Sequence, residues 1–183
     1  INFGRHLGLG EEDLNTIGIA AMLHDVGKTL TPLEVLNKEG ALTQDEFELM
    51  KAHTTEGRNI LMSHRNLAYG SVDVAYGHHE TLDGTGYPRK LKASGIPEMT
   101  RIVTLCDVYD AVTSDRPYKP GWDPSEAIAR MASWEGHFDS AIFGTSSIRL
   151  LDPADLDPAL GRFANLAMND ARAWEQYMLM KLF

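Results

Sequence analysis

The stretch GHHETLDGTGYP, residues 77–88, decides how the rest of the chain is interpreted. Two adjacent histidines, His78 and His79, are followed by the carboxylates of Glu80 and Asp83 before glycines and a proline turn the backbone out of helix. Adjacent imidazoles on a helix diverge by about 100°, so the pair suits two neighbouring metals, or a metal and a substrate, better than one ion. The stretch is interpreted as half of a metal site that ends in a substrate-facing loop.

The stretch LHDVGK, residues 23–28, is interpreted as the other half of this site. His24 and Asp25 follow an apolar run, residues 17–23, which is typical of a buried helix. An aspartate at the end of such a helix is costly to bury unpaired, and a cation is the usual compensation. We expect Gly27 to turn the chain out of the helix, so that Lys28 can reach toward whatever the metals hold.

Further candidate ligands lie on two other predicted helices. Asp107 and Asp110 are three residues apart in an apolar helix expected at about residues 99–114, so they share one face. Aspartates on an apolar face need partners. His53 lies within a helix expected from a capping box at Thr43 to about residue 65. By itself it is interpreted as a satisfied surface or core histidine.

Composition narrows the class of protein. A chain of 183 residues suits one domain with a full core, or one domain with an appendage. The net charge of −9 argues against non-specific binding to nucleic-acid polymers or anionic membranes. No apolar run reaches bilayer length, and the one cysteine, Cys106, excludes an internal disulfide. We therefore expect a cytoplasmic protein in which bound cations supply the positive field for any phosphate substrate.

Three blocks in this order, HDVGK, HHETLDGTGYP and DVYDAVTSDRPYK, resemble the signature of the HD-GYP family, a branch of the HD superfamily of metal-dependent phosphohydrolases. The resemblance covers roughly residues 4–139, and HHExxDGxGYP is its most specific part. It implies an all-α fold, a helical bundle with the metal site among its central helices. We predict an HD-GYP domain at residues 1–143 that lacks its first metal-binding helix, and a helical extension at residues 144–183 packed on the same domain.

The resemblance also implies a role for each candidate residue. Nitrogen and oxygen ligands without thiolates suit Fe or Mn, with Zn as a third option, and a bridging carboxylate from Asp25 favours a centre of two divalent transition-metal ions. The implied metal ligands are His24, Asp25, His53, His78, His79 and Asp107. The implied catalytic residues are Asp25, Lys28 and Asp110, and the implied substrate-binding residues are Gly86, Tyr87, Arg116 and Lys119.

Proteins of the HD-GYP family hydrolyse cyclic di-GMP to pGpG, and often on to GMP, so the resemblance implies a cyclic-dinucleotide phosphodiesterase that uses a metal-activated hydroxide. Two alternatives stay open. In one, the absence of the family's first ligand helix leaves a catalytically impaired module that acts as a nucleotide sensor, or binds a GGDEF-domain protein through the GYP loop. In the other, the chain is a different HD-superfamily nucleotide phosphohydrolase. The resemblance further implies fusion to, or regulation by, an upstream sensor or receiver domain, and a homodimer is one option for assembly.

Overall fold

The structure is a computed structural model that describes residues 1–38, 40–64, 66–115 and 120–146. Over these ranges the chain is helical and forms no strand, which confirms the all-α prediction. None of the described helices is both long enough and apolar enough to cross a membrane. The elements in order are α1 (Asn2–His6), α2 (Glu11–Leu23), the 3-10 helix η1 (Val26–Leu30), α3 (Leu33–Leu36), α4 (Gln44–Lys51), α5 (His53–Met62), α6 (Tyr69–Gly77), the 3-10 helix η2 (Ala93–Gly95), α7 (Glu98–Thr113), α8 (Pro124–Ala132) and α9 (Ser140–Ser146).

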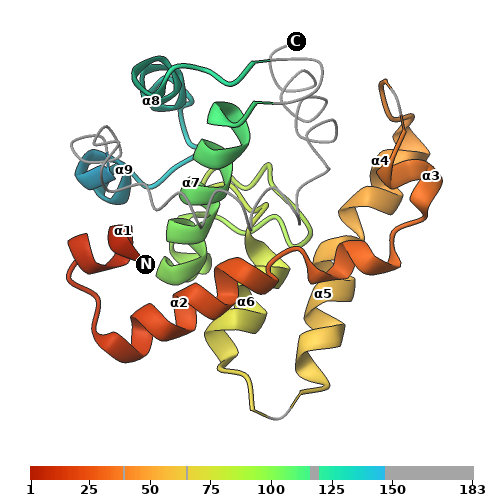
Figure 1. The fold of residues 1–183 in the computed structure, drawn as a ribbon, viewed down its shortest axis with the longest axis horizontal. Helices are drawn as coiled ribbons and strands as arrows, with labels where there is room; N and C mark the ends of the chain where they lie inside the picture. The colour runs from red at the N-terminus through yellow and green to blue at the C-terminus, as the bar shows by residue number, and fades with distance from the viewer. Residues whose placement is uncertain (39, 65, 116–119, 147–183) are drawn as a thin grey trace.

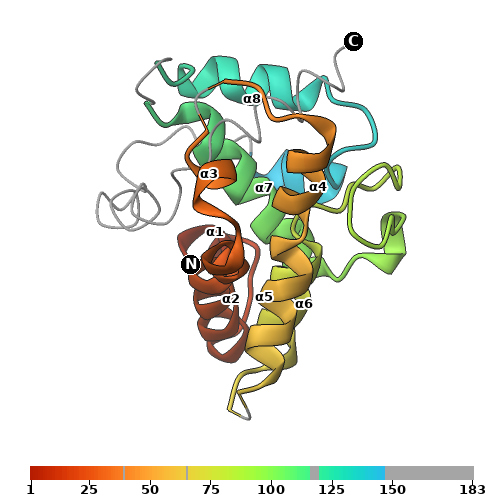
Figure 2. The ribbon, with the colours of Figure 1, turned by 90° about the vertical axis from the view of Figure 1, so that its right-hand side faces the viewer.

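Helix α6 lies at the centre of the described bundle. It packs against α2, α5 and α7, while η1 packs against α5 (Figures 1 and 2). Helix α7 also contacts α8 and α9, and α3 packs on α4 away from these two helices (Figure 1). The ends of α2 and α6, the start of α5 and the middle of α7 are therefore brought to one place, although they are distant in sequence.

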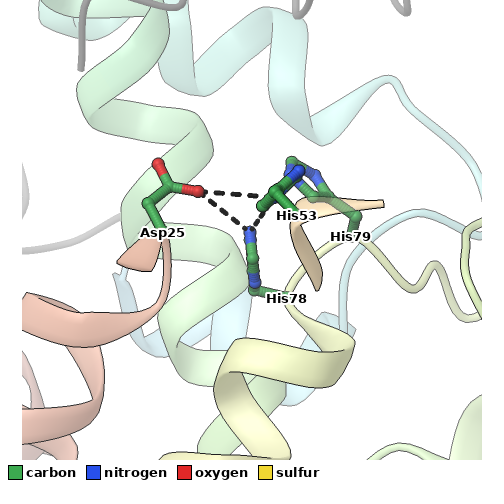
Figure 3. A group of neighbouring side chains, drawn as sticks. All are labelled: Asp25, His53, His78 and His79. Carbon is green, nitrogen blue, oxygen red and sulfur yellow. Dashed lines mark hydrogen bonds and ion pairs between the residues drawn. The ribbon is translucent and has the colours of Figure 1, made fainter. Parts of the chain in front are cut away.

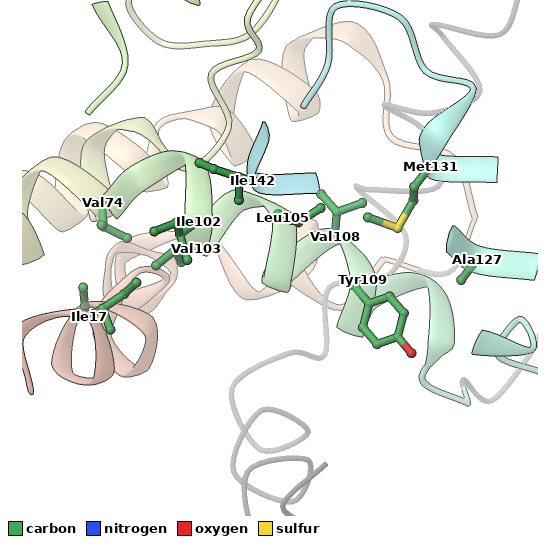
Figure 4. Close-up of a cluster of buried hydrophobic side chains, with 11 residues drawn as sticks. Ile17, Val74, Ile102, Val103, Leu105, Val108, Tyr109, Ala127, Met131 and Ile142 are labelled. Carbon is green, nitrogen blue, oxygen red and sulfur yellow. The ribbon is translucent and has the colours of Figure 1, made fainter. Parts of the chain in front are cut away.

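The main hydrophobic core surrounds α7 (Figure 4). Fully burying an aliphatic side chain contributes about 1.5–3 kcal/mol, so the apolar positions of α7 hold this helix firmly against its neighbours. This packing fixes where Asp107 stands. The core consists of Ile17, Ala20, Val74, Ile102, Val103, Leu105, Val108, Tyr109, Ala127, Met131 and Ile142.

Helices α4 and α8 both begin at a capping residue, which confirms the start predicted at Thr43. Thr43 and Glu46 form a full capping box at the start of α4, each side chain bonding to the other residue's backbone N–H. At α8 the side chain of Asp123 accepts a hydrogen bond from Ser125 N at 2.9 Å, and Pro124 occupies the first turn. Local side-chain chemistry determines these boundaries.

The single helix predicted from Thr43 to residue 65 is wrong, because the structure divides it at Ala52 into α4 and α5. Backbone carbonyls just before the break accept hydrogen bonds from side chains just after it. His53 Nδ1 lies 2.6 Å from Met50 O, and Thr54 Oγ1 donates to Lys51 O at 3.0 Å. Such bonds compete with the helical backbone ladder, and here they turn His53 inward.

Two other predictions concern the ends of elements. The helix expected to continue to the histidine pair ends at Gly77, so that His78 is its C-cap and His79 and Glu80 lie in the following turn. The predicted extension at residues 144–183 lies outside the described residues except for its first residues, which are in α9. The division into residues 1–143 and 144–183 stays a prediction.

Candidate metal centre

The candidate ligands come from helix ends that the bundle brings together. His24 is the C-cap of α2 and Asp25 precedes η1. His53 is the first residue of α5, and His78 is the C-cap of α6. Asp107 is in the interior of α7, and all of these side chains are buried. The packing of α6 on α2, α5 and α7 therefore places imidazoles and carboxylates in one desolvated site.

Three of the histidines are oriented by backbone carbonyls of the preceding turn. His24 Nδ1 lies 2.7 Å from Ala21 O, and His53 Nδ1 lies 2.6 Å from Met50 O. His78 Nδ1 contacts a carbonyl one turn back, at 3.1 Å from Val74 O. Because a carbonyl oxygen only accepts, each Nδ1 carries a proton, and Nε2 is left with a lone pair whenever the ring is neutral. In a metal-binding histidine, a hydrogen bond from the ring nitrogen that does not bind the metal orients the ring.

The Nε2 atoms of His53 and His78 converge on one oxygen of Asp25 (Figure 3). Asp25 Oδ1 lies 3.4 Å from His53 Nε2 and 3.5 Å from His78 Nε2, and the two Nε2 atoms are 3.3 Å apart. Two ligands bound at about 2.0–2.1 Å to one tetrahedral ion are about 3.3 Å apart, so the spacing fits a shared cation. His79 joins this set, because one ligand atom from each of the four side chains lies within 4.8 Å of the others.

The second oxygen of Asp25 faces a different set of residues. His24 Nε2 lies 3.3 Å from Asp25 Oδ2 and 3.5 Å from Asp107 Oδ1. Among the described residues, no hydrogen-bond partner reaches the buried atoms His24 Nε2 and Asp25 Oδ1. Buried polar atoms left in this way are costly unless an ion satisfies them. The carboxylate of Asp25 thus stands between two incomplete ligand sets.

The electrostatics of the centre favour added positive charge. Burial alone would raise the pKa of the Asp25 carboxyl, but the ammonium of Lys28 and the imidazole of His24 hold it well below its usual range. Burial opposes a charge on His24 as well, yet Asp25 and Asp107 outweigh burial and raise the pKa of His24 well above its usual value. Burial lowers the pKa of His53 to about 3, so this ring stays neutral. A bound cation would supply the charge that a proton on His24 otherwise supplies.

Glu80 has a role that the sequence did not reveal. The residue is 2% exposed, and its two side-chain oxygens accept hydrogen bonds from Arg89 N at 2.7 Å and Leu91 N at 2.8 Å. Glu80 therefore secures the loop that follows the histidine pair. The sequence shows a glutamate that follows two candidate ligands and precedes a Gly-rich turn. Its hydrogen-bond partners, however, lie nine and eleven residues further along the chain.

Gly86 and Tyr87 attach the same loop to His79. A Cβ on Gly86 would lie 2.4 Å from both His79 O and Thr81 N, so the backbone here leaves no room for a side chain. Tyr87 N donates to His79 O at 3.1 Å, and the Tyr87 ring stacks on the His79 ring with centroids 4.7 Å apart. The two residues predicted to bind substrate thus lie directly against a candidate ligand.

The other predicted site residues have different surroundings. Lys28 Nζ donates to Asp25 Oδ2 at 2.6 Å, so the ammonium lies at the centre itself. Asp110 is partly buried and lies one turn beyond Asp107 on α7. Arg116 and Lys119 lie outside the described residues.

Gly27 is needed for close packing as well as for the turn expected from it. A Cβ there would lie 1.9 Å from His53 O and 2.5 Å from Gly57 N. This contact brings η1, and with it Asp25 and Lys28, against the start of α5. The close approach of two backbones has no signature in a single sequence beyond the glycines themselves.

Comparisons with known proteins agree with this geometry. The family model described as HD domain matches residues 2–142. The cyclic di-GMP phosphodiesterase PA4108 of Pseudomonas aeruginosa is 47% identical over 143 residues, which is 78% of this chain and 34% of that protein. The cyclic di-GMP phosphodiesterase response regulator RpfG of Xanthomonas campestris is 40% identical over 162 residues, which is 87% of this chain and 39% of that protein. The chain thus spans well under half the length of these curated relatives.

Solved structures share the fold at lower identity. Bd1817, an HDG"Y"P protein from Bdellovibrio bacteriovorus, has a TM-score of 0.65 at 21% identity, covering 80% of this chain and 47% of that one. A cyclic GMP-AMP specific phosphodiesterase of Vibrio cholerae, V-cGAP3, has a TM-score of 0.65 at 19% identity, covering 94% of this chain and 47% of that one. The sequence blocks, the helical bundle and the family model agree: the chain belongs to the HD domain family, in its HD-GYP branch.

Proposed function

We propose that this domain is a metal-dependent phosphodiesterase that hydrolyses cyclic di-GMP to pGpG, with hydrolysis of pGpG to GMP as an open second step. The observation that carries the proposal is the position of Asp25, whose two oxygens face two different sets of ligands. Relatives at 40–47% identity are named cyclic di-GMP phosphodiesterases, which supports the choice of substrate.

The proposed centre holds two divalent transition-metal ions, Fe or Mn with Zn as a third option. In one set, Asp25 Oδ1 acts with His53, His78 and His79, and in the other, Asp25 Oδ2 acts with His24 and Asp107. Imidazole and carboxylate ligands without thiolates suit these metals. When bound, two such ions stabilise charge on a phosphoryl group and lower the pKa of a water molecule, so no side-chain nucleophile is needed.

The chain's own residues would orient the substrate and balance its charge. Lys28 stands at Asp25, where its ammonium can neutralise a phosphate oxygen that approaches the centre. Asp110 is proposed to orient a ligand or accept a proton, on the helix that carries Asp107. Gly86 and Tyr87 would shape the cavity wall next to His79, and Arg116 and Lys119 would hold phosphate.

We further propose a cytoplasmic location and control by an upstream sensor or receiver domain. The relative RpfG is named a response regulator, which supports an arrangement of this kind. The same proposal includes binding of a GGDEF-domain protein at the GYP loop and assembly of the chain as a homodimer. An impaired module that senses nucleotide is the alternative to an enzyme.

A second cyclic dinucleotide is a specific competitor for the substrate assignment. Two relatives at 37% and 35% identity are named 3'3'-cGAMP-specific phosphodiesterases 2 and 1 of Vibrio cholerae. A panel of cyclic di-GMP, 3'3'-cGAMP and a linear dinucleotide would rank these substrates. A kcat/KM that is higher for 3'3'-cGAMP than for cyclic di-GMP would reassign the substrate and keep the reaction.

The test of the proposed function combines two measurements on one sample purified without chelator. Elemental analysis should give about two transition-metal ions per chain, and pGpG or GMP should appear when cyclic di-GMP is added. Metal near zero with no product, even after Mn or Fe has been added, would contradict the proposal and favour the impaired module.

A further inference from the structure

Lys51, the last residue of α4, brings a positive charge to the aromatic edge of the metal centre. Its Nζ lies 5.0 Å from the Phe47 ring centroid and 5.8 Å from the Tyr87 ring centroid. Phe47 is buried and meets Tyr87 edge-on at 6.4 Å, which steadies the ring beside the lysine. Since Tyr87 stacks on His79, a single ring separates the Lys51 ammonium from a proposed metal ligand.

The contacts of Lys51 leave its charge available to an arriving anion. Its side chain is 23% exposed, so the aliphatic stem is covered while the ammonium can reach water. Nζ pairs with Glu48 Oε1 at 2.6 Å, and the Glu48 side chain is 56% exposed. A surface pair of this kind is weak, because water and salt compete with it. A phosphate can therefore compete with Glu48 for the lysine.

A cyclic dinucleotide would benefit from a cation beside the metal centre. It carries two phosphodiesters, and only one of them can be at the proposed metal ions during a hydrolytic step. The other must be neutralised nearby, in a chain whose net charge of −9 repels anions on average. Lys28 is already engaged within the centre at Asp25, and Arg116 and Lys119 lie outside the described residues. Lys51 is a described cation that lies beside the ring of Tyr87.

We propose that Lys51 is a substrate-binding residue that contacts the phosphate not being hydrolysed. This assignment rests on the proposed function, because it takes a cyclic dinucleotide as the ligand of the metal centre. Lys51 and Tyr87 would together form the outer wall of the site, with the cation beside the ring that lies against His79. The phosphate takes the place of Glu48, which is exposed and can return to water.

The test separates binding from chemistry in the metal-loaded chain. Calorimetry with a phosphorothioate analogue of cyclic di-GMP gives Kd, and turnover is measured on cyclic di-GMP and on bis(p-nitrophenyl) phosphate, a diester with one phosphate. Lys51→Met should weaken the analogue's Kd and raise KM for cyclic di-GMP by about tenfold, as expected for one charge-assisted contact, with kcat within about twofold. The single-phosphate diester should be hydrolysed as by the unaltered chain.

Two further variants act as controls. Lys51→Arg keeps the charge and should restore most of the affinity. Lys38→Met removes a lysine that also pairs with a glutamate of α4, Glu46, and it should leave both substrates unaffected. Metal content is measured in each variant to confirm that the centre stays loaded.

Each other outcome has a definite meaning. Unchanged binding in Lys51→Met would overturn the assignment, and so would an equal loss on both substrates, which would point to displacement of Tyr87. If the unaltered chain binds the analogue but hydrolyses nothing, the proposed function fails, and the Kd ratio still decides the role of Lys51. If it binds no analogue at all, both proposals fall.

Discussion

His53 Nε2 and His78 Nε2 face each other at 3.3 Å, while the Nδ1 atom of each ring contacts a backbone carbonyl of the preceding turn. With a proton on each Nδ1, two lone pairs point at one another in a buried site. Such a contact is repulsive unless a proton or a metal ion lies between the atoms. The helices therefore hold these rings in an arrangement that a bound metal ion would stabilise.

Metal binding should accordingly stabilise the fold. At a free metal concentration of 100–1,000 times Kd, one ion adds about 2.7–4.1 kcal/mol to the free energy of unfolding. Thermal unfolding of chelator-treated protein, with and without added Mn, measures this gain as a rise in Tm. A Tm that does not respond to Mn in the native chain would contradict the metal assignment, and His53→Ala, which removes one of the two rings, should abolish most of the response.

Replacing Asp25 should lower the metal content per chain more than replacing Asp107 does. Asp25 faces both ligand sets, whereas Asp107 lies beside His24 in one of them. Asp25→Asn should therefore lower metal content from about two ions per chain toward zero, and Asp107→Asn should leave about one. Elemental analysis after dialysis measures both. Equal losses in the two variants would mean that the two ligand sets do not fill independently.

Lys28 should affect turnover more than metal content. Its Nζ donates to Asp25 Oδ2, on the side of the carboxylate that faces His24. Lys28→Ala removes a charge next to the reacting phosphate but no metal ligand, so kcat should fall by roughly 10²-fold while the metal is retained. Rates normalised to metal content test this. A variant that loses its metal along with its activity would show that Lys28 acts through the centre's assembly.

The sequence was sufficient to predict the residues with metal-binding chemistry, but not the way in which they are brought together. His24, Asp25 and the histidine pair could be selected from residue type and local pattern, and the resemblance added His53. Their convergence depends on α6 packing against three other helices, and such long-range packing leaves no periodic signal. Resemblance to a family supplied that information.

The features that were missed arise from tertiary contacts. The helix break at Ala52 accompanies a bond from the His53 ring to Met50 O, and the sequence pattern alone does not indicate it. Gly27 could be recognised as a turn residue, but its contact with Gly57 depends on how η1 meets α5. Glu80 has the residue type of a metal ligand, and only the path of the loop shows that it binds backbone amides.

Glu80→Gln should loosen the loop without removing a metal ligand. Both carboxylate oxygens accept backbone N–H groups, from Arg89 and Leu91, and glutamine offers only one acceptor in their place. One buried amide would lose its partner, at a cost of about 1–3 kcal/mol. Hydrogen exchange should then become faster at Arg89 or Leu91 and stay unchanged in α8. Unaltered exchange at both amides would mean that Glu80 does not secure the loop.

Asp139 should make the stability of the bundle depend on pH in the acid range. It pairs with Arg101 of α7, and its Oδ1 accepts Ala141 N at 2.9 Å and Ile142 N at 3.3 Å at the start of α9. Burial would raise the pKa of this carboxyl, but the two amides and the Arg101 guanidinium lower it below its usual value. Stabilisation from a lowered pKa is fully present above about pH 4 and is lost as the pH falls through the folded-state pKa.

Because other carboxylates titrate over the same range, the informative quantity is the difference between the native chain and Asp139→Asn. Asparagine keeps an acceptor for the amides but loses the charge, so the native chain should be more stable at pH 7 by about 1 kcal/mol. Urea unfolding at pH 7, 5 and 3 should give the same difference at the first two values and a smaller one at the third. If the difference in unfolding free energy were the same at pH 3, the charge of Asp139 could not be its source, because that charge is being neutralised there. The contact of α9 with α7 would then depend on shape and neutral hydrogen bonds.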